Sequence, residues 1–227
     1  MFWKKEPIAP RRPLDLERVK KAIVRVGHGR GFLVGDYRKD HFGYVWRDVV
    51  TAASCLPEFP SFDPFKGPER LHSYDFILGR LDEEPSLSVK CRFADPVSNL
   101  AVLASHSDAY ERFIHWDVAI QIAPPLRPHA PGAGPIEQDV WLLMLDGEWI
   151  KCTATGHTNH ISISGEPGLF DGAMSGTPII NEDGDAIGMI SAPRTDDEGY
   201  DDDWYYCFPI LTRRLPDGAF GPNNGVV

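Results

Sequence analysis

The sequence predicts an all-β fold made of many short strands. Short apolar segments recur along most of the chain, and turn-forming residues separate them at a spacing of about 8–12 residues. The 227 residues include 21 glycines and 20 prolines, which suit a chain with many tight turns. No internal repeat and no heptad pattern points to a repeat protein or a coiled coil. These observations favour antiparallel sheets closed into barrels.

The expected elements begin with an extended arm over residues 1–13, which is rich in proline and basic residues. A short helix follows over 14–21, where two apolar residues stand three apart on one helix face. The strand candidates cover residues 22–26, 31–35, 49–51, 74–81, 87–93 and 100–103, and then 117–122, 139–145, 148–155, 159–164, 177–181, 186–191 and 204–210. A loop rich in proline and phenylalanine spans 58–69, and a second short helix begins at 212–215.

The chain is long enough to bury the core of one domain, or of two small barrels that share an interface. We expect an N-terminal β-barrel over residues 14–104 and a linker over 105–116. A C-terminal β-barrel is expected over 117–215, followed by a loose tail over 216–227.

Three short blocks carry the functional signal. The first reads V-V-T-A-A-S-C and ends at Cys55, and the second reads D-P-V-S-N-L-A-V-L and ends at Leu103. The third, G-A-M-S-G-T-P, places Ser175 in a turn before an apolar strand, an Asn-Glu-Asp-Gly hairpin and a second apolar strand. In this order the blocks resemble the histidine, aspartate and serine segments of the trypsin-like (chymotrypsin-fold) serine proteases, including bacterial HtrA-like peptidase domains.

The resemblance covers the chain from about residue 20 to about residue 212 and implies its fold. That fold is two six-stranded antiparallel β-barrels with a short N-terminal and a short C-terminal helix. By position, Ser175 matches the catalytic serine, Ser54 the histidine and Asn99 the aspartate of the family. Two of the three catalytic positions therefore hold a different residue type.

These replacements remove the chemistry of the triad. A serine hydroxyl needs a base within hydrogen-bond reach, and that base needs an orienting acceptor. Ser54 cannot take the proton of Ser175, and Asn99 has no charge with which to stabilise an imidazolium. In serine proteases the loss of the histidine alone lowers turnover by about a millionfold. The sequence therefore predicts no ordinary triad catalysis.

The resemblance also locates parts of the site that handle substrate. The oxyanion hole corresponds to the N–H groups of Ala173 and Ser175, and alanine stands where the family has a glycine. The floor of the specificity pocket corresponds to Leu169, which favours an apolar side chain. The strand that pairs with an extended peptide corresponds to Ser191, Ala192 and Pro193. Because Pro193 has no N–H, a bound peptide loses one hydrogen bond there.

Simpler interpretations exist for each of these positions. Ser175 can be interpreted as an ordinary turn residue, Ser54 as a helix cap, and Asn99 as a loop residue before a strand. A displaced histidine, His28 or His157, is the alternative source of a base. His157 and His160 together make half a metal site, but no carboxylate or cysteine joins them at ligand spacing, so we expect no metal and no cofactor.

Charge and cysteine usage narrow the class of protein further. The net charge of −10 gives no electrostatic support for nucleic-acid binding. We expect no signal peptide and no transmembrane helix, because no apolar stretch follows the charged N-terminus. In secreted relatives a disulfide joins the cysteine after the catalytic histidine to the preceding strand. Here these positions are Cys55 and Gly29, which favours a free thiol and a reducing cytoplasm.

The sequence thus predicts a catalytically inactive protease homologue, a pseudoprotease, that binds a protein or peptide partner as a regulatory, scaffold or sensor module. We expect neither nucleic acid nor membrane among its partners. The alternative is an active serine endopeptidase in which a non-standard base or a partner chain serves Ser175. In a third interpretation, Ser54 and Asn99 are engineered replacements that trap an inactive form.

Overall fold

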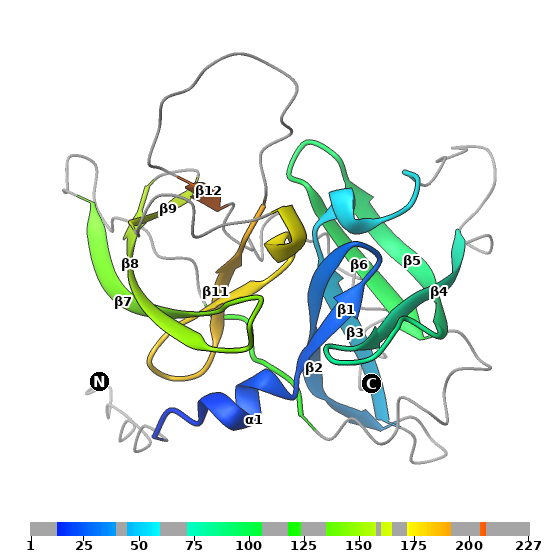
Figure 1. Cartoon of the computed structure of the whole chain (residues 1–227), viewed down its shortest axis with the longest axis horizontal. Helices are drawn as coiled ribbons and strands as arrows, with labels where there is room; N and C mark the ends of the chain where they lie inside the picture. Colours follow the sequence, from blue (N-terminus) through cyan, green and yellow to red (C-terminus); the bar gives the residue numbers. More distant parts are fainter. Residues whose placement is uncertain are drawn as a thin grey trace, which may run out of the picture.

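The computed structural model describes residues 13–39, 45–59, 72–105, 118–123, 135–157, 160–164, 172–191 and 205–207. Within these ranges the chain is almost entirely β-structure. Two curved sheets lie side by side, and the N-terminal helix α1 (Leu16–Lys20) lies beside their junction (Figure 1).

The first sheet closes into a six-stranded barrel. Its strands are ordered β1-β2-β3-β6-β5-β4. They are β1 (Ile23–Val26), β2 (Gly29–Lys39), β3 (Val45–Thr51), β4 (Ser73–Arg80), β5 (Leu87–Asp95) and β6 (Leu100–Ser105). All described pairings are antiparallel, and β1 closes the barrel on β4 through the register Arg25↔Gly79.

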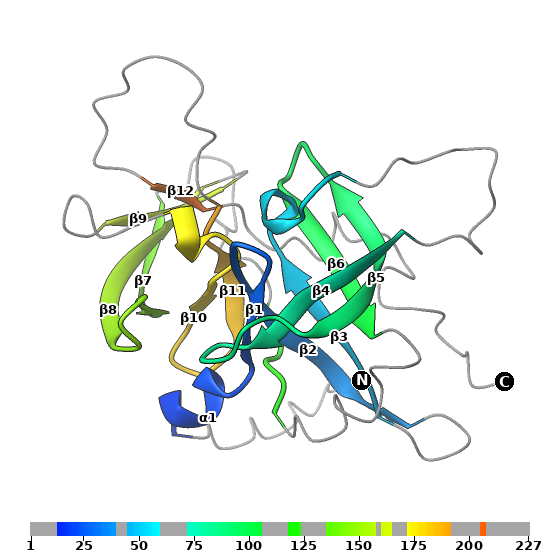
Figure 2. The same cartoon turned by 45° about the vertical axis from the view of Figure 1, so that its right-hand side comes forward.

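The second sheet has six strands in the order β11-β10-β7-β8-β9-β12. They are β7 (Ile136–Leu143), β8 (Trp149–Gly156), β9 (Ile161–Ser164), β10 (Pro178–Ile180), β11 (Ala186–Met189) and β12 (Tyr205–Cys207). Figure 2, turned from the first view, shows this sheet curling beside the first barrel.

Alternating side chains explain why these segments form barrels. In β5, Leu87, Val89 and Cys91 are buried, while the residues between them are partly exposed. A strand turns successive side chains to opposite faces, so this alternation buries one face of the sheet and leaves the other toward water. In β8, Cys152 and Ala154 follow the same pattern.

Two short 3-10 turns lie where the sheets meet. The turn η1 (Ala53–Cys55) follows β3, and η3 (Gly172–Met174) precedes β10. The segment 118–123 also links the two sheets, because Ile120 forms a parallel bridge with Val34 and Ile122 forms one with Ala186.

The predicted fold class is confirmed in its all-β character, its closed barrel, its second curled sheet and its N-terminal helix. One expected strand differs, because residues 118–122 form two isolated bridges in place of a full strand. The expected helix at 212–215 and the tail over 216–227 lie outside the described residues, as does the expected arm over 1–13 apart from residue 13. The division into barrels and linker remains a prediction. No helix among the described residues has the length and apolarity needed to cross a membrane.

Candidate functional site

The side chains of Ser54 and Ser175 meet at the junction of the two sheets. Their Oγ atoms lie 3.1 Å apart, which is hydrogen-bond distance, and either hydroxyl can act as donor. Ser54 belongs to η1 and is exposed, whereas Ser175 follows η3 and is only 4 % exposed. The fold therefore brings into direct contact the two serines that the motifs assign to the histidine and serine positions.

Asn99 completes this cluster from the turn between β5 and β6. Its Oδ1 accepts the backbone N–H of Ser54 at 2.8 Å, and this contact fixes the orientation of the amide because a backbone N–H can only donate. The Nδ2 group therefore faces two hydroxyl oxygens, Ser54 Oγ at 3.2 Å and Ser191 Oγ at 2.7 Å. Asn99 acts as an amide donor within the cluster and supplies no charge.

The local sequence explains how Asn99 reaches this place. Asp95 accepts hydrogen bonds from the N–H of Val97 at 2.9 Å and from the hydroxyl of Ser98 at 2.5 Å, which shapes the turn before β6. Asn99 itself has a φ of 49°, in the left-handed region that asparagine tolerates better than most residues. Its carbonyl also accepts the N–H of Ala53 at 3.2 Å, so two backbone-linked contacts join this turn to η1.

The Ser175 segment packs closely against the first barrel. The carbonyl oxygen of Ser175 accepts the N–H of Arg30 at 2.8 Å and lies 3.3 Å from the Sγ of Cys55. Gly176 has a φ of 85°, and a Cβ added there would lie 1.9 Å from the carbonyl oxygen of Arg30. Only glycine fits this approach, because any side chain would collide with the backbone of β2.

The backbone N–H of Ser175 points inward to its own turn. It donates to the carbonyl of Gly172 at 3.0 Å, within η3. An oxyanion hole requires such N–H groups to aim at the oxygen that becomes charged during reaction. In this conformation the N–H of Ser175 is bonded to Gly172 and is not available to such an oxygen. Ala173 belongs to the same tight turn.

Cys55 and Gly29 face each other, as the motif comparison led us to expect. A Cβ added at Gly29 would lie 2.6 Å from the Sγ of Cys55 and 2.6 Å from the carbonyl oxygen of Ser175. Cys55 is a buried free thiol, and burial raises its pKa. Cys91 and Cys152 are also free and buried, and burial raises the pKa of Cys91 to about 11. Such thiols are poor nucleophiles because little thiolate forms.

The two histidines considered as alternative bases have other surroundings. His28 is exposed in the turn between β1 and β2. His157 has its Nε2 2.9 Å from Ser162 Oγ and stacks on His160 with ring centroids 4.4 Å apart. Among the described residues no group of three or more histidine, cysteine, aspartate or glutamate side chains is arranged to hold a metal ion.

The remaining predicted site residues divide into two groups. Ser191 is buried, and its side chain joins the cluster through Asn99, a contact that the sequence did not predict. Leu169, Ala192 and Pro193 lie outside the described residues. The sequence analysis also missed Arg30, whose backbone holds Ser175 and whose side chain crosses the junction to the carbonyls of Leu143 and Met144. The only sequence signal for it is an arginine between two glycines, directly before the predicted strand 31–35.

Comparison with known proteins gives distant likeness in structure and none in sequence. No protein-family profile matches the chain, and no curated protein matches its sequence. Its structure is similar to that of a human pathogenic astrovirus serine protease, with 14% identity, a TM-score of 0.48, and coverage of 86% of this chain and 92% of that one. It is also similar to the inactive form of the Rv3671c protease, with 14% identity, a TM-score of 0.46, and coverage of 88% and 90%. An inactive serine-to-alanine mutant of Rv3671c from M. tuberculosis H37Rv gives 14% identity, a TM-score of 0.43, and coverage of 90% and 91%.

The cluster can form hydrogen bonds but has no group that takes up a proton near neutral pH. It contains three hydroxyls and one amide, from Ser54, Ser175, Ser191 and Asn99. None of these side chains has the basicity of an imidazole or a carboxylate. These four side chains form hydrogen bonds with one another and include no general base.

Proposed function

We propose that this chain is a catalytically inactive homologue of the trypsin-like serine proteases that binds a protein or peptide partner as a regulatory or scaffold module. One observation carries the proposal: the group at hydrogen-bond distance from Ser175 Oγ is the hydroxyl of Ser54, 3.1 Å away. This is where a general base would have to stand. The HtrA-like assignment stays a prediction from the motifs.

The chemistry of the neighbouring groups strengthens this argument. Asn99 Nδ2 donates to Ser54 Oγ, so the amide presents a donor to this hydroxyl, and either serine hydroxyl can be the donor in the contact between them. A nucleophile is activated when a basic neighbour accepts its proton, and neither the Ser54 hydroxyl nor the Asn99 amide is basic enough to hold that proton. The inward N–H of Ser175, bonded to Gly172, further supports an inactive site.

The catalytic half of the proposal is tested by labelling the purified protein with a fluorophosphonate probe, which reacts with activated serines. Wild type and Ser175→Ala should both remain unlabelled at a probe concentration that labels an active trypsin-like protease to completion. Labelling or peptide hydrolysis that disappears in Ser175→Ala would contradict the proposal. His28→Gln and His157→Gln would then identify the base.

The binding half is tested separately with a displayed library of random peptides. Ser54 is exposed beside Ser175, so Ser54→Arg places a large side chain over the cluster without disturbing a buried position. Peptides selected on the wild type should lose most of their affinity for Ser54→Arg and keep it for Ser86→Arg, an exposed serine in the turn before β5. Equal loss in both variants, or none in either, would contradict binding at this site.

We also propose that the protein works in a reducing compartment such as the cytoplasm. The support is the free thiol of Cys55 facing a glycine where secreted relatives carry a disulfide. The midpoint of thermal unfolding should be the same with and without a reducing agent. A midpoint that falls by several degrees on reduction would show a structural disulfide and contradict this proposal.

A further inference from the structure

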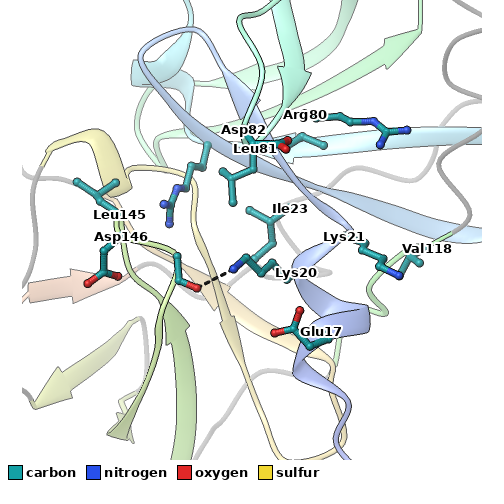
Figure 3. Close-up of a pocket in the computed structure, with 13 residues that line it drawn as sticks. Glu17, Lys20, Lys21, Ile23, Arg80, Leu81, Asp82, Val118, Leu145 and Asp146 are labelled. Atoms are coloured by element: carbon teal, nitrogen blue, oxygen red, sulfur yellow. Dashed lines mark hydrogen bonds between the residues drawn. The ribbon is translucent and has the colours of Figure 1, made fainter.

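A hollow lies between the two sheets, and none of the four side chains of the serine cluster lines it. It has a volume of about 800 Å³ and is bordered by α1, by the turn between β4 and β5, and by the turn between β7 and β8. Figure 3 shows Lys20 reaching from α1 toward the β7–β8 turn, where its Nζ donates to the carbonyl of Gly147 at 2.8 Å. Leu81 and Leu145 border the hollow from the two turns (Figure 3).

Arg30 lines this hollow with a buried positive charge. The residue is 5 % exposed, and its guanidinium donates to the carbonyls of Leu143 at 2.5 Å and Met144 at 2.9 Å. A guanidinium has five N–H donors, so these two bonds leave three of them for another acceptor. Burial lowers the pKa of Arg30, an effect partly opposed by the more distant Asp146, and the side chain remains charged at neutral pH.

No carboxylate of the described residues lies within ion-pair distance of this guanidinium. The three carboxylates that border the hollow, Glu17, Asp82 and Asp146, are all exposed, and Oδ1 of Asp146 accepts the N–H of Glu148 within its own turn. Because water and salt screen exposed charges, these three carboxylates compensate a buried cation poorly. Buried charges in proteins are normally paired, because an unpaired one is costly.

The other basic groups at the hollow reinforce the same sign of charge. Lys20, Lys21 and Arg80 border it together with Arg30. They outnumber the three bordering carboxylates although the chain as a whole carries a net charge of −10. The border of the hollow therefore carries an excess of positive charge, opposite in sign to the net charge of the whole protein.

We propose that this hollow binds a small multivalent oxyanion, a phosphate or a carboxylate carried by a small molecule, with Arg30 as its buried anchor. The planar guanidinium suits the paired oxygens of either group through two parallel hydrogen bonds. Lys21 and Arg80 stand at the border to attract the anion. This inference does not depend on the proposed function, because it concerns the side chain of Arg30 and not the serine cluster.

The test is thermal unfolding in inorganic phosphate, pyrophosphate or citrate, each compared with sodium chloride at matched ionic strength. At least one anion should raise the unfolding midpoint of the wild type in a saturable way, by about 5–10 °C at a hundredfold excess over Kd. Saturation with pyrophosphate or phosphate alone indicates a phosphate-bearing ligand, and saturation with citrate alone indicates a carboxylate-bearing one.

Three variants separate this site from general salt effects. Arg30→Gln should abolish the saturable rise, while Arg25→Gln, which removes an exposed arginine paired with Glu84, should leave it unchanged. Leu145→Glu, at a residue 47 % exposed on the border of the hollow, adds a negative charge that repels an entering anion and should also abolish the rise. Leu145→Glu keeps Arg30 in place and decides the question if Arg30→Gln does not fold. No saturable rise in the wild type, or an equal rise in Leu145→Glu, would overturn the inference.

Discussion

The Oγ atoms of Ser54 and Ser175 lie 3.1 Å apart although 121 positions separate the two residues in the chain. The distance is one at which a base would accept the proton of a nucleophile. The partner, however, is a second hydroxyl that receives a hydrogen bond from the amide of Asn99. The cluster therefore keeps the geometry of a proton-transfer site and lacks its chemistry.

The first prediction concerns Asn99 as the organising residue of this cluster. Asn99→Ala should lower the free energy of unfolding by about 2–4 kcal/mol, because it removes three side-chain hydrogen bonds and places alanine at a φ of 49°. Asn99→Asp should cost much less, since its carboxylate still accepts the N–H of Ser54 and the hydroxyl of Ser191 can turn to donate. Urea denaturation of both variants checks this difference. Equal losses would mean that the hydrogen bonds of Asn99 contribute little.

The second prediction concerns restoration of catalysis. Ser54→His with Asn99→Asp should produce weak fluorophosphonate labelling, because the exposed position of Ser54 leaves room for an imidazole. Adding Ala173→Gly should raise the labelling rate further, by up to about 10²–10³-fold. The physical reason is that the peptide between Gly172 and Ala173 must turn over to release the N–H of Ser175, and glycine permits the resulting backbone conformation.

The matched control for this series carries Ser175→Ala in the background of the three other changes, and it should show no labelling. Ala173→Gly by itself, without the new histidine, should also remain unlabelled because no base is present. A triple variant that labels no faster than the double variant would mean that the turn of Gly172–Met174 does not limit reactivity.

The third prediction is that Gly29→Cys will form a disulfide with Cys55. The Cβ position of residue 29 lies 2.6 Å from the Sγ of Cys55, close enough for bonding once the carbonyl oxygen of Ser175, also 2.6 Å away, has shifted. The disulfide would close the loop from residue 29 to residue 55, which should gain about 3.5 kcal/mol before strain is subtracted. The oxidised variant should therefore unfold at a higher temperature than the same variant after reduction.

Gly29→Ala is the control for this disulfide. It adds the same Cβ, 2.6 Å from the carbonyl oxygen of Ser175, with no bond to compensate. Its midpoint should lie below that of the wild type. If the oxidised cysteine variant retains two reactive thiols at these positions under denaturing conditions, the proposed geometry is wrong.

The fourth prediction concerns pH. Burial, and then the nearby charge of His157, lower the pKa of His160 below its ordinary value of 6.5. The unfolded chain therefore binds more protons than the folded one between the depressed pKa and 6.5, and stability falls as the pH drops through this window. Urea midpoints measured from pH 7.5 to pH 5 should fall more in the wild type than in His160→Gln. A variant with the same pH slope as the wild type would exclude this residue as the cause.

The sequence by itself determined the secondary structure class and predicted which positions form a site. Alternating apolar residues in segments such as 87–93 predicted strands, because a strand turns successive side chains to opposite faces. The three motif blocks predicted that Ser54, Asn99 and Ser175 belong to one site, and Gly29 opposite Cys55 followed from the same comparison. These predictions depend on local patterns and on chain order, which a sequence contains.

Only the tertiary structure decided what these residues do to one another. The direction of the Asn99 amide is set by the backbone N–H of Ser54, and the inward N–H of Ser175 by the carbonyl of Gly172. Ser191 enters the cluster and Arg30 reaches the carbonyls of Leu143 and Met144 because two separate sheets pack together. Hydrogen bonds and burial between distant segments depend on distances of a few ångströms that no local pattern fixes. For this reason the sequence predicted which residues form a site, while the packing of the two sheets determined their contacts.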